Sequence, residues 1–224
     1  MLRKIQSANK IPTATYINVV IISETNYTII CEKNSQINKK TEISKITISK
    51  NQMEAIIETK RLILREFTQD DAALIYQLNL DPRVIEYTKD PIRDLKQAKE
   101  ILTNIILPQY TLYKHGRWAV HTKNDFAFIG WCGLKYIKKR NEIDLGYRFI
   151  QAAWGKGFAT EAALQCIDYG FRQLRIPKII GRAMPENTAS IRVLKKCGMQ
   201  FVNETVVDGH PAKTYELNNP FIPL

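Results

Sequence analysis

The sequence predicts an α+β fold built on a mixed, mostly antiparallel central sheet. Strand-like runs at residues 117–122, 126–136 and 143–150 are separated by short polar turns, the pattern of an antiparallel meander. The third run leads through a glycine-containing turn into an amphipathic helix over residues 158–174. Another strand-like run follows at residues 178–183. A strand, a helix and a second strand in this order predict a parallel pair, so both kinds of pairing are expected.

A strand and a helix are expected ahead of the meander. Leu62 and Leu64 suit one face of a short strand. Thr68 is followed three residues later by Asp71, a spacing typical of the N-terminal cap of a helix. The helix is expected over residues 71–80, where an Asp-Pro pair stops it.

Two further helices and two strands complete the pattern. An amphipathic helix is expected over residues 95–107 and is ended by Pro108, because proline cannot donate the next helical hydrogen bond. A short helix over residues 188–197 is followed by Gly198 in the position of a C-terminal cap. The last strands are expected at residues 201–207 and 212–217.

Residues 1–52 differ in composition from the rest of the chain. They contain no glycine and show no helical period, although residues 15–22 and 27–31 alternate as strands do. We interpret this segment as an N-terminal extension of unknown role, either loosely ordered or strand-forming. The functional domain is expected over residues 53–224, and we hypothesise that Met53 can serve as its start.

Composition narrows the classes of function. The chain has 33 Lys and Arg against 22 Asp and Glu, a net charge of +11 that attracts anionic ligands. The lysines are spread singly or in pairs, so they indicate a solvated surface and do not favour nucleic acid as a partner. No uncharged apolar run reaches the roughly 18 residues of a spanning helix, and no signal-peptide pattern is present. A cytoplasmic protein without a membrane partner is expected.

Neither a metal site nor a disulfide framework is expected. The cysteines are Cys31, Cys132, Cys166 and Cys197. They lack the paired short spacing of either kind of site, and the three histidines lie in unrelated segments. We interpret the cysteines as reduced, mostly buried thiols.

The turn between the meander and the long helix carries the first chemical signal. Gly155 and Gly157 stand just ahead of the helix. A helix N-terminus exposes unpaired N–H groups and the positive end of the helix dipole, so glycines there let a diphosphate approach closely. Taken alone, the two glycines fit an ordinary tight turn equally well.

Three motifs in order strengthen the phosphate interpretation. They are Asp-Leu-Gly-Tyr-Arg-Phe at 144–149, Trp-Gly-Lys-Gly-Phe-Ala-Thr-Glu-Ala at 154–162 and Pro-Glu-Asn-Thr-Ala-Ser at 185–190. With the opening Thr-Lys-Arg-Leu-Ile-Leu-Arg at 59–65, they resemble the GNAT acetyltransferase superfamily over residues 57–217. Within it they are most similar to the ribosomal-protein N-terminal alanine and serine acetyltransferases. Ala152 departs from the superfamily, which usually has Gln or Arg there.

The resemblance implies acetyl-CoA as co-substrate, no metal, and a sheet that splays at the acetyl-CoA site between helices on both faces. It also implies direct attack by a primary amine without an acyl-enzyme, with a backbone N–H holding the thioester oxygen. The residues implied for coenzyme binding are Phe149, Ile150, Trp154, Gly155, Lys156, Gly157, Phe158, Ala159, Thr160, Asn187 and Ser190.

Three residues are candidates for the proton transfers. The resemblance implies Ser190 as the acid that returns a proton to the departing thiolate, with Asn187 positioning the pantetheine arm. Asp144 or Glu142 is the candidate base, acting through water. Structural roles compete with each assignment: Asn187 suits a helix N-cap, Ser190 a first helical turn, and the two carboxylates a solvated strand.

The acceptor is the least determined feature. A lysine side chain with a pKa of about 10.4 is seldom neutral at pH 7, whereas an α-amine near about 7.7–8.0 needs less help from a base. The weak signal for a base therefore favours a protein N-terminal amine. The alternatives are a polyamine, an amino acid or an aminoglycoside-like drug, or a noncatalytic protein that binds RNA or ribosomes. We expect a monomer or a homodimer.

Overall fold

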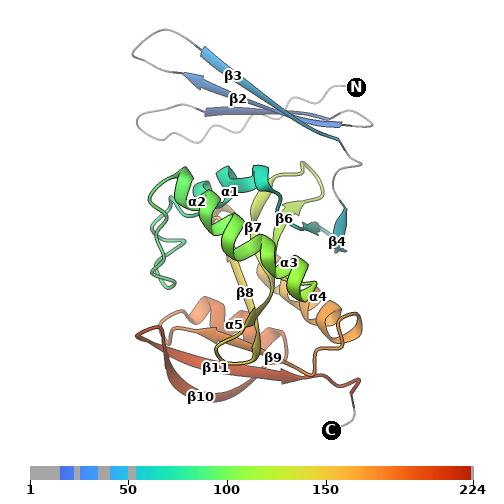
Figure 1. The fold of residues 1–224 in the computed structure, drawn as a ribbon, viewed down its shortest axis with the longest axis vertical. Helices are drawn as coiled ribbons and strands as arrows, with labels where there is room; N and C mark the ends of the chain where they lie inside the picture. The colour runs from blue at the N-terminus through green and yellow to red at the C-terminus, as the bar shows by residue number, and fades with distance from the viewer. Residues whose placement is uncertain (1–15, 23–25, 35–40, 50–53, 223–224) are drawn as a thin grey trace. The chain divides into compact units, whose positions relative to one another are not determined.

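The computed structural model describes residues 16–22, 26–34, 41–49 and 54–222, which divide into two compact units at the junction of Glu54 and Ala55 (Figure 1). The first unit contains a three-stranded antiparallel sheet. Its strands, in spatial order, are β1 (Tyr16–Ile22), β2 (Asn26–Asn34) and β3 (Thr41–Ser49). The sequence predicts the first two strands but not β3. Thr15, placed in the first expected strand, and Met53, the hypothesised start, lie outside the described residues.

The second unit is built on an eight-stranded sheet in the order β10-β11-β9-β8-β7-β6-β5-β4. Neighbouring strands are antiparallel except β8 and β9, which are parallel. This arrangement confirms the predicted α+β fold. The strands are β4 (Ala55–Glu58), β5 (Leu62–Arg65), β6 (Arg117–Thr122), β7 (Phe128–Ile137), β8 (Glu142–Phe149), β9 (Lys178–Ala183), β10 (Gln200–Val207) and β11 (His210–Asn218).

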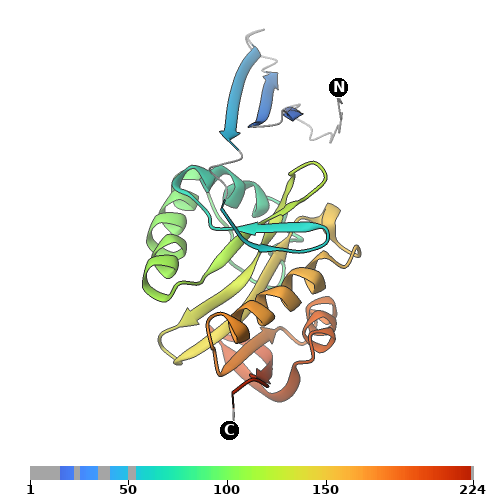
Figure 2. The ribbon, with the colours of Figure 1, turned by 90° about the vertical axis from the view of Figure 1, so that its right-hand side faces the viewer.

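Helices cover both faces of this sheet. They are α1 (Ala72–Leu78), α2 (Leu95–Ile101), α3 (Leu107–Tyr113), α4 (Phe158–Arg172) and α5 (Thr188–Lys196). Figure 2 shows α2 and α3 on one side of the strands and α4 and α5 on the other. Apolar side chains from the sheet and both helical layers form one core, which includes Leu64, Trp118, Leu102 and Phe171. Among the described residues, no helix combines the length and the apolar character needed to cross a membrane.

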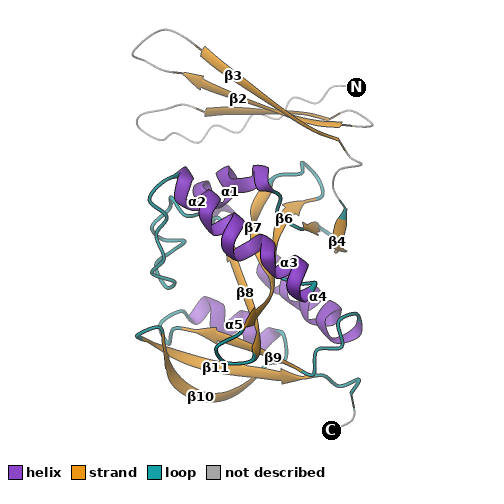
Figure 3. Ribbon diagram, in the orientation of Figure 1, coloured by secondary structure: helices purple, strands orange, loops and turns teal. Residues whose placement is uncertain are grey.

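The helix expected to end at Pro108 continues past it. A π-helical turn, η3 (Leu102–Ile106), links α2 to α3, and the Leu107 N–H donates to the Leu102 carbonyl. Figure 3 shows the three segments as one continuous helix. Pro108 lies in the first turn of α3. The prediction was wrong because the π turn restarts the hydrogen-bond pattern, and proline is tolerated in a first turn where its missing N–H is not needed.

Both predicted helix caps are present. Thr68 and Asp71 form a capping box around the 3-10 turn η2 (Gln69–Asp71), which opens α1. Gly198 follows α5 with a φ of +80°, and its N–H donates to the Lys195 carbonyl at 3.0 Å. A glycine is favoured there because only it adopts a positive φ without steric cost.

Candidate active site

A gap opens between the two parallel strands. β8 and β9 pair only at Asp144 with Ile180 and at Leu145 with Gly181, although β8 continues to Phe149. Beyond Leu145 the strands part, which is the splay that the resemblance implies. The end of β8 leads through the 3-10 turn η4 (Gln151–Ala153) into α4. The gap therefore runs from Leu145 at its closed end to the glycine turn at its open end.

The backbone groups that face the gap follow from the pairing on the other side of β8. The Ile150 N–H donates to the Ile129 carbonyl of β7 at 2.9 Å. The backbone groups of successive residues in a strand point toward the neighbouring strands on opposite sides. The N–H and C=O groups of Tyr147 and Phe149 therefore point away from β7, toward the gap. The Phe149 carbonyl accepts a hydrogen bond from the Trp154 indole at 2.8 Å. The Phe149 N–H and the Tyr147 backbone thus remain directed at a ligand in the gap.

The glycine turn has the backbone shape that the sequence predicts. Gly155 and Gly157 have φ values of +72° and +79°, and Gly157 is the N-cap of α4. The carboxylate of Glu161, in the first helical turn, bonds to Thr59 and Arg61 on the turn between β4 and β5. Trp154 and Lys156 are exposed in this turn, which leads directly into the N-terminus of the 15-residue helix α4. This geometry suits an anionic group.

Ser190 is held next to β8 by Tyr147, a residue to which the sequence analysis gave no role. The Ser190 Oγ donates to the Tyr147 hydroxyl at 2.9 Å, and the Tyr147 hydroxyl donates to the Ser190 carbonyl, also at 2.9 Å. Burial raises the pKa of Tyr147 well above its usual value, so the phenol stays protonated at neutral pH. The Asn187 side chain caps α5 by accepting the Ser190 N–H at 3.0 Å. The structure therefore brings Ser190 to the face of β8 that carries Tyr147.

Asp144 and Glu142 lie on the opposite face of β8, and each pairs with an arginine. Arg117 holds the Asp144 Oδ2, and the two side chains are only 14% and 18% exposed. Arg182 contacts both carboxylate oxygens of Glu142, at 3.0 and 2.9 Å. Asp144 lies one residue before Leu145, the last position of β8 that pairs with β9, whereas Glu142 lies two residues further from the gap. Asp144 is therefore better placed to reach a group in the gap.

A third arginine lies on this same face, near the open end. Arg148 is buried, and its guanidinium contacts both carboxylate oxygens of Asp90, at 2.8 and 2.9 Å, and the side chain of Asn79. Trp131 lies between Arg148 and Arg117, with the two guanidinium carbons 5.5 and 5.2 Å from its ring. Arg117 itself lies flat over Gly146, where a β-carbon would come within 2.5 Å of the guanidinium. The guanidinium groups of Arg117 and Arg148 and the Trp131 ring thus border the gap on this face of β8.

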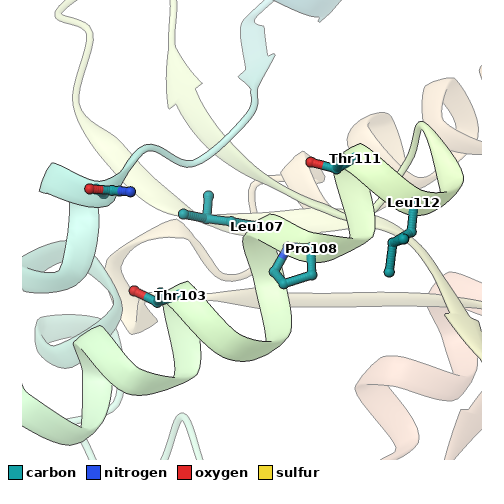
Figure 4. Close-up of a pocket in the computed structure, with 6 residues that line it drawn as sticks. Thr103, Leu107, Pro108, Thr111 and Leu112 are labelled. Atoms are coloured by element: carbon teal, nitrogen blue, oxygen red, sulfur yellow. The ribbon is translucent and has the colours of Figure 1, made fainter.

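The surface pocket drawn in Figure 4 is separate from this gap. Its lining comes from one helical segment and η2, with the labelled side chains spaced along η3 and α3. The lining residues are Gln69, Thr103, Leu107, Pro108, Thr111 and Leu112. None of them belongs to the residues predicted for the site, so the pocket does not bear on the coenzyme assignment.

The candidate metal ligands and the cysteines in the described part of the domain form neither a metal site nor a disulfide. Across residues 54–222 no cluster of His, Cys, Asp and Glu has the arrangement of a metal site. Cys132, Cys166 and Cys197 are buried and not disulfide-bonded, and burial raises the pKa of Cys197 to about 12. A buried thiol of high pKa is a poor nucleophile.

Known proteins are similar to this chain in sequence or in fold. The acetyltransferase (GNAT) domain family matches residues 61–200. An uncharacterized N-acetyltransferase, p20 of Bacillus licheniformis, is 35% identical over 144 residues, covering 63% of this chain and 80% of the relative. The ribosomal-protein-S5-alanine acetyltransferase of Vibrio fischeri has a TM-score of 0.62 at 19% identity, over 74% of this chain and 97% of that one. The spermidine N-acetyltransferase of Vibrio cholerae, solved with CoA and spermine, has a TM-score of 0.61 at 20% identity, over 72% and 97%.

The family match spans more than half of the chain, so the chain belongs to the GNAT acetyltransferase family. This confirms the predicted enzyme class, an N-acetyltransferase. Enzymes of this family take acetyl-CoA as the acetyl donor. The two structural neighbours act on different amines by name and are similar to this chain in fold alone.

Proposed function

We propose that the chain transfers an acetyl group from acetyl-CoA directly to a primary amine, with the α-amine of a protein N-terminus as acceptor. One observation carries the proposal. The gap between β8 and β9 ends at one side on a helix N-terminus that suits a diphosphate, and at the other on candidate acid and base residues. Coenzyme A carries its diphosphate at one end of the pantetheine arm and the thioester at the other, which is the order of groups that this arrangement requires.

Two proton transfers are assigned to opposite faces of β8. Acetyl-CoA, when bound, would supply the thioester, and the N–H groups of Tyr147 and Phe149, which face the gap, would hold its carbonyl oxygen. Ser190, held by Tyr147, is the candidate donor to the departing thiolate. Asp144, held by Arg117, is the candidate acceptor of the amine proton through water, with Glu142 as the more distant alternative.

The charges beside the gap support a weakly basic acceptor over a polyamine. Three carboxylates beside the gap pair with arginines: Asp144 with Arg117, Glu142 with Arg182 and Asp90 with Arg148. Lys135 adds a further basic group. Its pKa is lowered mainly by burial and, to a lesser extent, by the positive charge of Arg117. A polycation would have to displace an arginine to gain a carboxylate partner, which like-charge repulsion opposes. An α-amine carries at most one charge and loses it more readily.

Calorimetry of acetyl-CoA binding tests the coenzyme site. Gly157→Trp should weaken binding by at least about a hundredfold. The indole would occupy the space that the diphosphate needs beside the glycine turn, and the positive φ disfavours any side chain. Gly209→Trp is the matched control: Gly209 also has a positive φ, with open space around it in the turn between β10 and β11. No binding by the wild type, or equal loss in both variants, would contradict the proposal.

Acceptor preference is measured in the same preparation. Peptides that begin with Ala or Ser should be acetylated at the α-amine with kcat/KM at least about tenfold above spermidine or an N-terminally blocked lysine peptide. Faster turnover of spermidine would show that the acceptor is a polyamine instead.

A further inference from the structure

The turn between β4 and β5, near the start of the domain in sequence, contacts the glycine turn and the first turn of α4. The turn between β4 and β5 places three donors on the Glu161 carboxylate. The Thr59 hydroxyl lies 2.5 Å from Oε1, the Arg61 N–H 3.0 Å from Oε1, and the Arg61 Nε 2.7 Å from Oε2. Thr59 also accepts the Leu62 N–H at 2.9 Å. Glu161 therefore ties the start of α4 to an ordered turn of the sheet.

The Arg61 guanidinium lies against the glycine turn. Its Nη1 donates to the Lys156 carbonyl at 2.9 Å, and its central carbon lies 4.4 Å from the centre of the Phe158 ring. Its Nη2 lies 3.5 Å from where a β-carbon on Gly157 would stand. The side chain is nevertheless 43% exposed. Arg61 thus lies against the turn itself while its charge stays accessible from solvent.

These contacts fix the direction of a backbone donor. The carbonyl and the following N–H of a trans peptide point in opposite directions, and the described residues contain no cis peptide. With the Lys156 carbonyl held by Arg61, the Gly157 N–H points away from the guanidinium. A turn with two positive-φ glycines has much freedom to lose, so an external bond that selects one conformation favours ligand binding.

The same contacts keep an anion away from the helix N-terminus. Gly157 supplies no side-chain cap to α4. A free glutamate one turn into a helix is attracted by the exposed N–H groups and the dipole, where it would compete with a diphosphate. Thr59 and Arg61 hold the Glu161 carboxylate on the turn between β4 and β5 and balance its charge.

We propose that Arg61 and Glu161 are positioning residues for the diphosphate of the coenzyme. They hold the glycine turn in its binding conformation through the forked hydrogen bonds of the guanidinium, and this inference rests on the proposed acetyl-CoA site. The geometry of the fork is required in addition to its charge, because one plane must reach Glu161 and the Lys156 carbonyl together.

The test compares a donor that has the diphosphate with one that lacks it. Binding of acetyl-CoA is measured by calorimetry, and turnover is measured with S-acetylpantetheine, which has the thioester but no phosphate. Arg61→Gln, Arg61→Lys and Glu161→Gln should each raise the Kd for acetyl-CoA by about tenfold, the loss of one charge-assisted hydrogen bond. Their kcat/KM with S-acetylpantetheine should stay within about twofold of wild type, which also shows that the variants are folded.

Arg172→Gln is the matched control. Arg172 makes the same two kinds of contact at the far end of α4, a 2.7 Å bond to Asp168 and a guanidinium 4.1 Å from the Phe221 ring. This variant should leave both measurements unchanged. Wild-type affinity for acetyl-CoA in Arg61→Lys would overturn this inference but not the proposed function. An equal loss of kcat/KM with S-acetylpantetheine would do the same. No binding of acetyl-CoA by the wild type would refute the proposed function and the inference with it.

Discussion

At the scale of single residues, His121 shows how a buried polar side chain links stability to pH. It lies inside the core on β6, stacked on Phe126 at 4.5 Å and edge-on to Phe128 at 5.6 Å. Its Nδ1 faces the Phe126 carbonyl at 3.1 Å and must therefore be the protonated nitrogen of the neutral ring. The buried Nε2 has no hydrogen-bond partner. Burial, and after it the charge of Arg65, lowers the pKa of His121 from 6.5 to about 4.

The low pKa predicts a loss of stability in acid. Between pH 6.5 and about 4 the unfolded chain binds a proton on His121 that the folded protein does not, so the free energy of unfolding falls as the pH drops. The full loss is about 3 kcal/mol and is complete below about pH 4. Urea unfolding measured across this range should show a shallower slope in His121→Asn. Parallel curves for the two proteins would show that His121 contributes nothing.

At the scale of elements, the loop between α1 and α2 is held to the end of β8. Asn79, at the end of α1, and Asp90, late in the loop, both bond to the buried guanidinium of Arg148. Arg148 immediately precedes Phe149, whose N–H faces the gap. One side chain thus positions this loop, on the proposed acceptor side, relative to the strand proposed to hold the thioester.

This arrangement predicts a selective effect on the acceptor. Asp90→Asn removes the charge that holds the loop, and we expect the KM for the acceptor to rise about three- to tenfold while the Kd for acetyl-CoA stays constant. Asp81→Asn is the matched control, because Asp81 forms an exposed ion pair with Arg83 in the same loop, at 2.7 Å. Equal changes in the acceptor KM for both variants, or a weaker Kd for acetyl-CoA in Asp90→Asn, would argue against this role.

At the scale of the whole molecule, the unit that begins at Ala55 contains its own core. Among residues 54–222, whose burial the structure describes, the main apolar cluster extends from Ile57 to Tyr215, and the residues proposed for the site lie in the same unit. We therefore propose residues 53–224 as an autonomous enzyme domain, with residues 1–52 as an extension of unassigned role.

Expression of the shortened chain tests this division. Residues 53–224 should fold cooperatively and bind acetyl-CoA with a Kd within about twofold of the full chain, since the core and the cradle are retained. Circular dichroism on heating and calorimetry are the measurements. A shortened chain that does not fold, or folds without binding, would show that the first unit is part of the functional domain.

The sequence by itself determined what depends on neighbours a few residues apart. The glycine turn with its following helix, the capping box of Thr68 and Asp71 and the cap at Gly198 are all local patterns, and each is present. The three motifs were also sufficient to predict the family. Pro108 was the local misreading, because a π turn ahead of it cannot be recognised from residue types alone.

Only the tertiary structure decided which distant side chains meet. Arg61 and Glu161 are 100 positions apart, Tyr147 and Ser190 are 43 apart, and Arg117 and Asp144 are 27 apart. Propensity and periodicity record interactions along one element, whereas these contacts depend on strand order and register. The sequence therefore pointed to Ser190, Asp144 and the glycine turn, and the fold supplied the residues that hold them: Tyr147, Arg117 and Arg61.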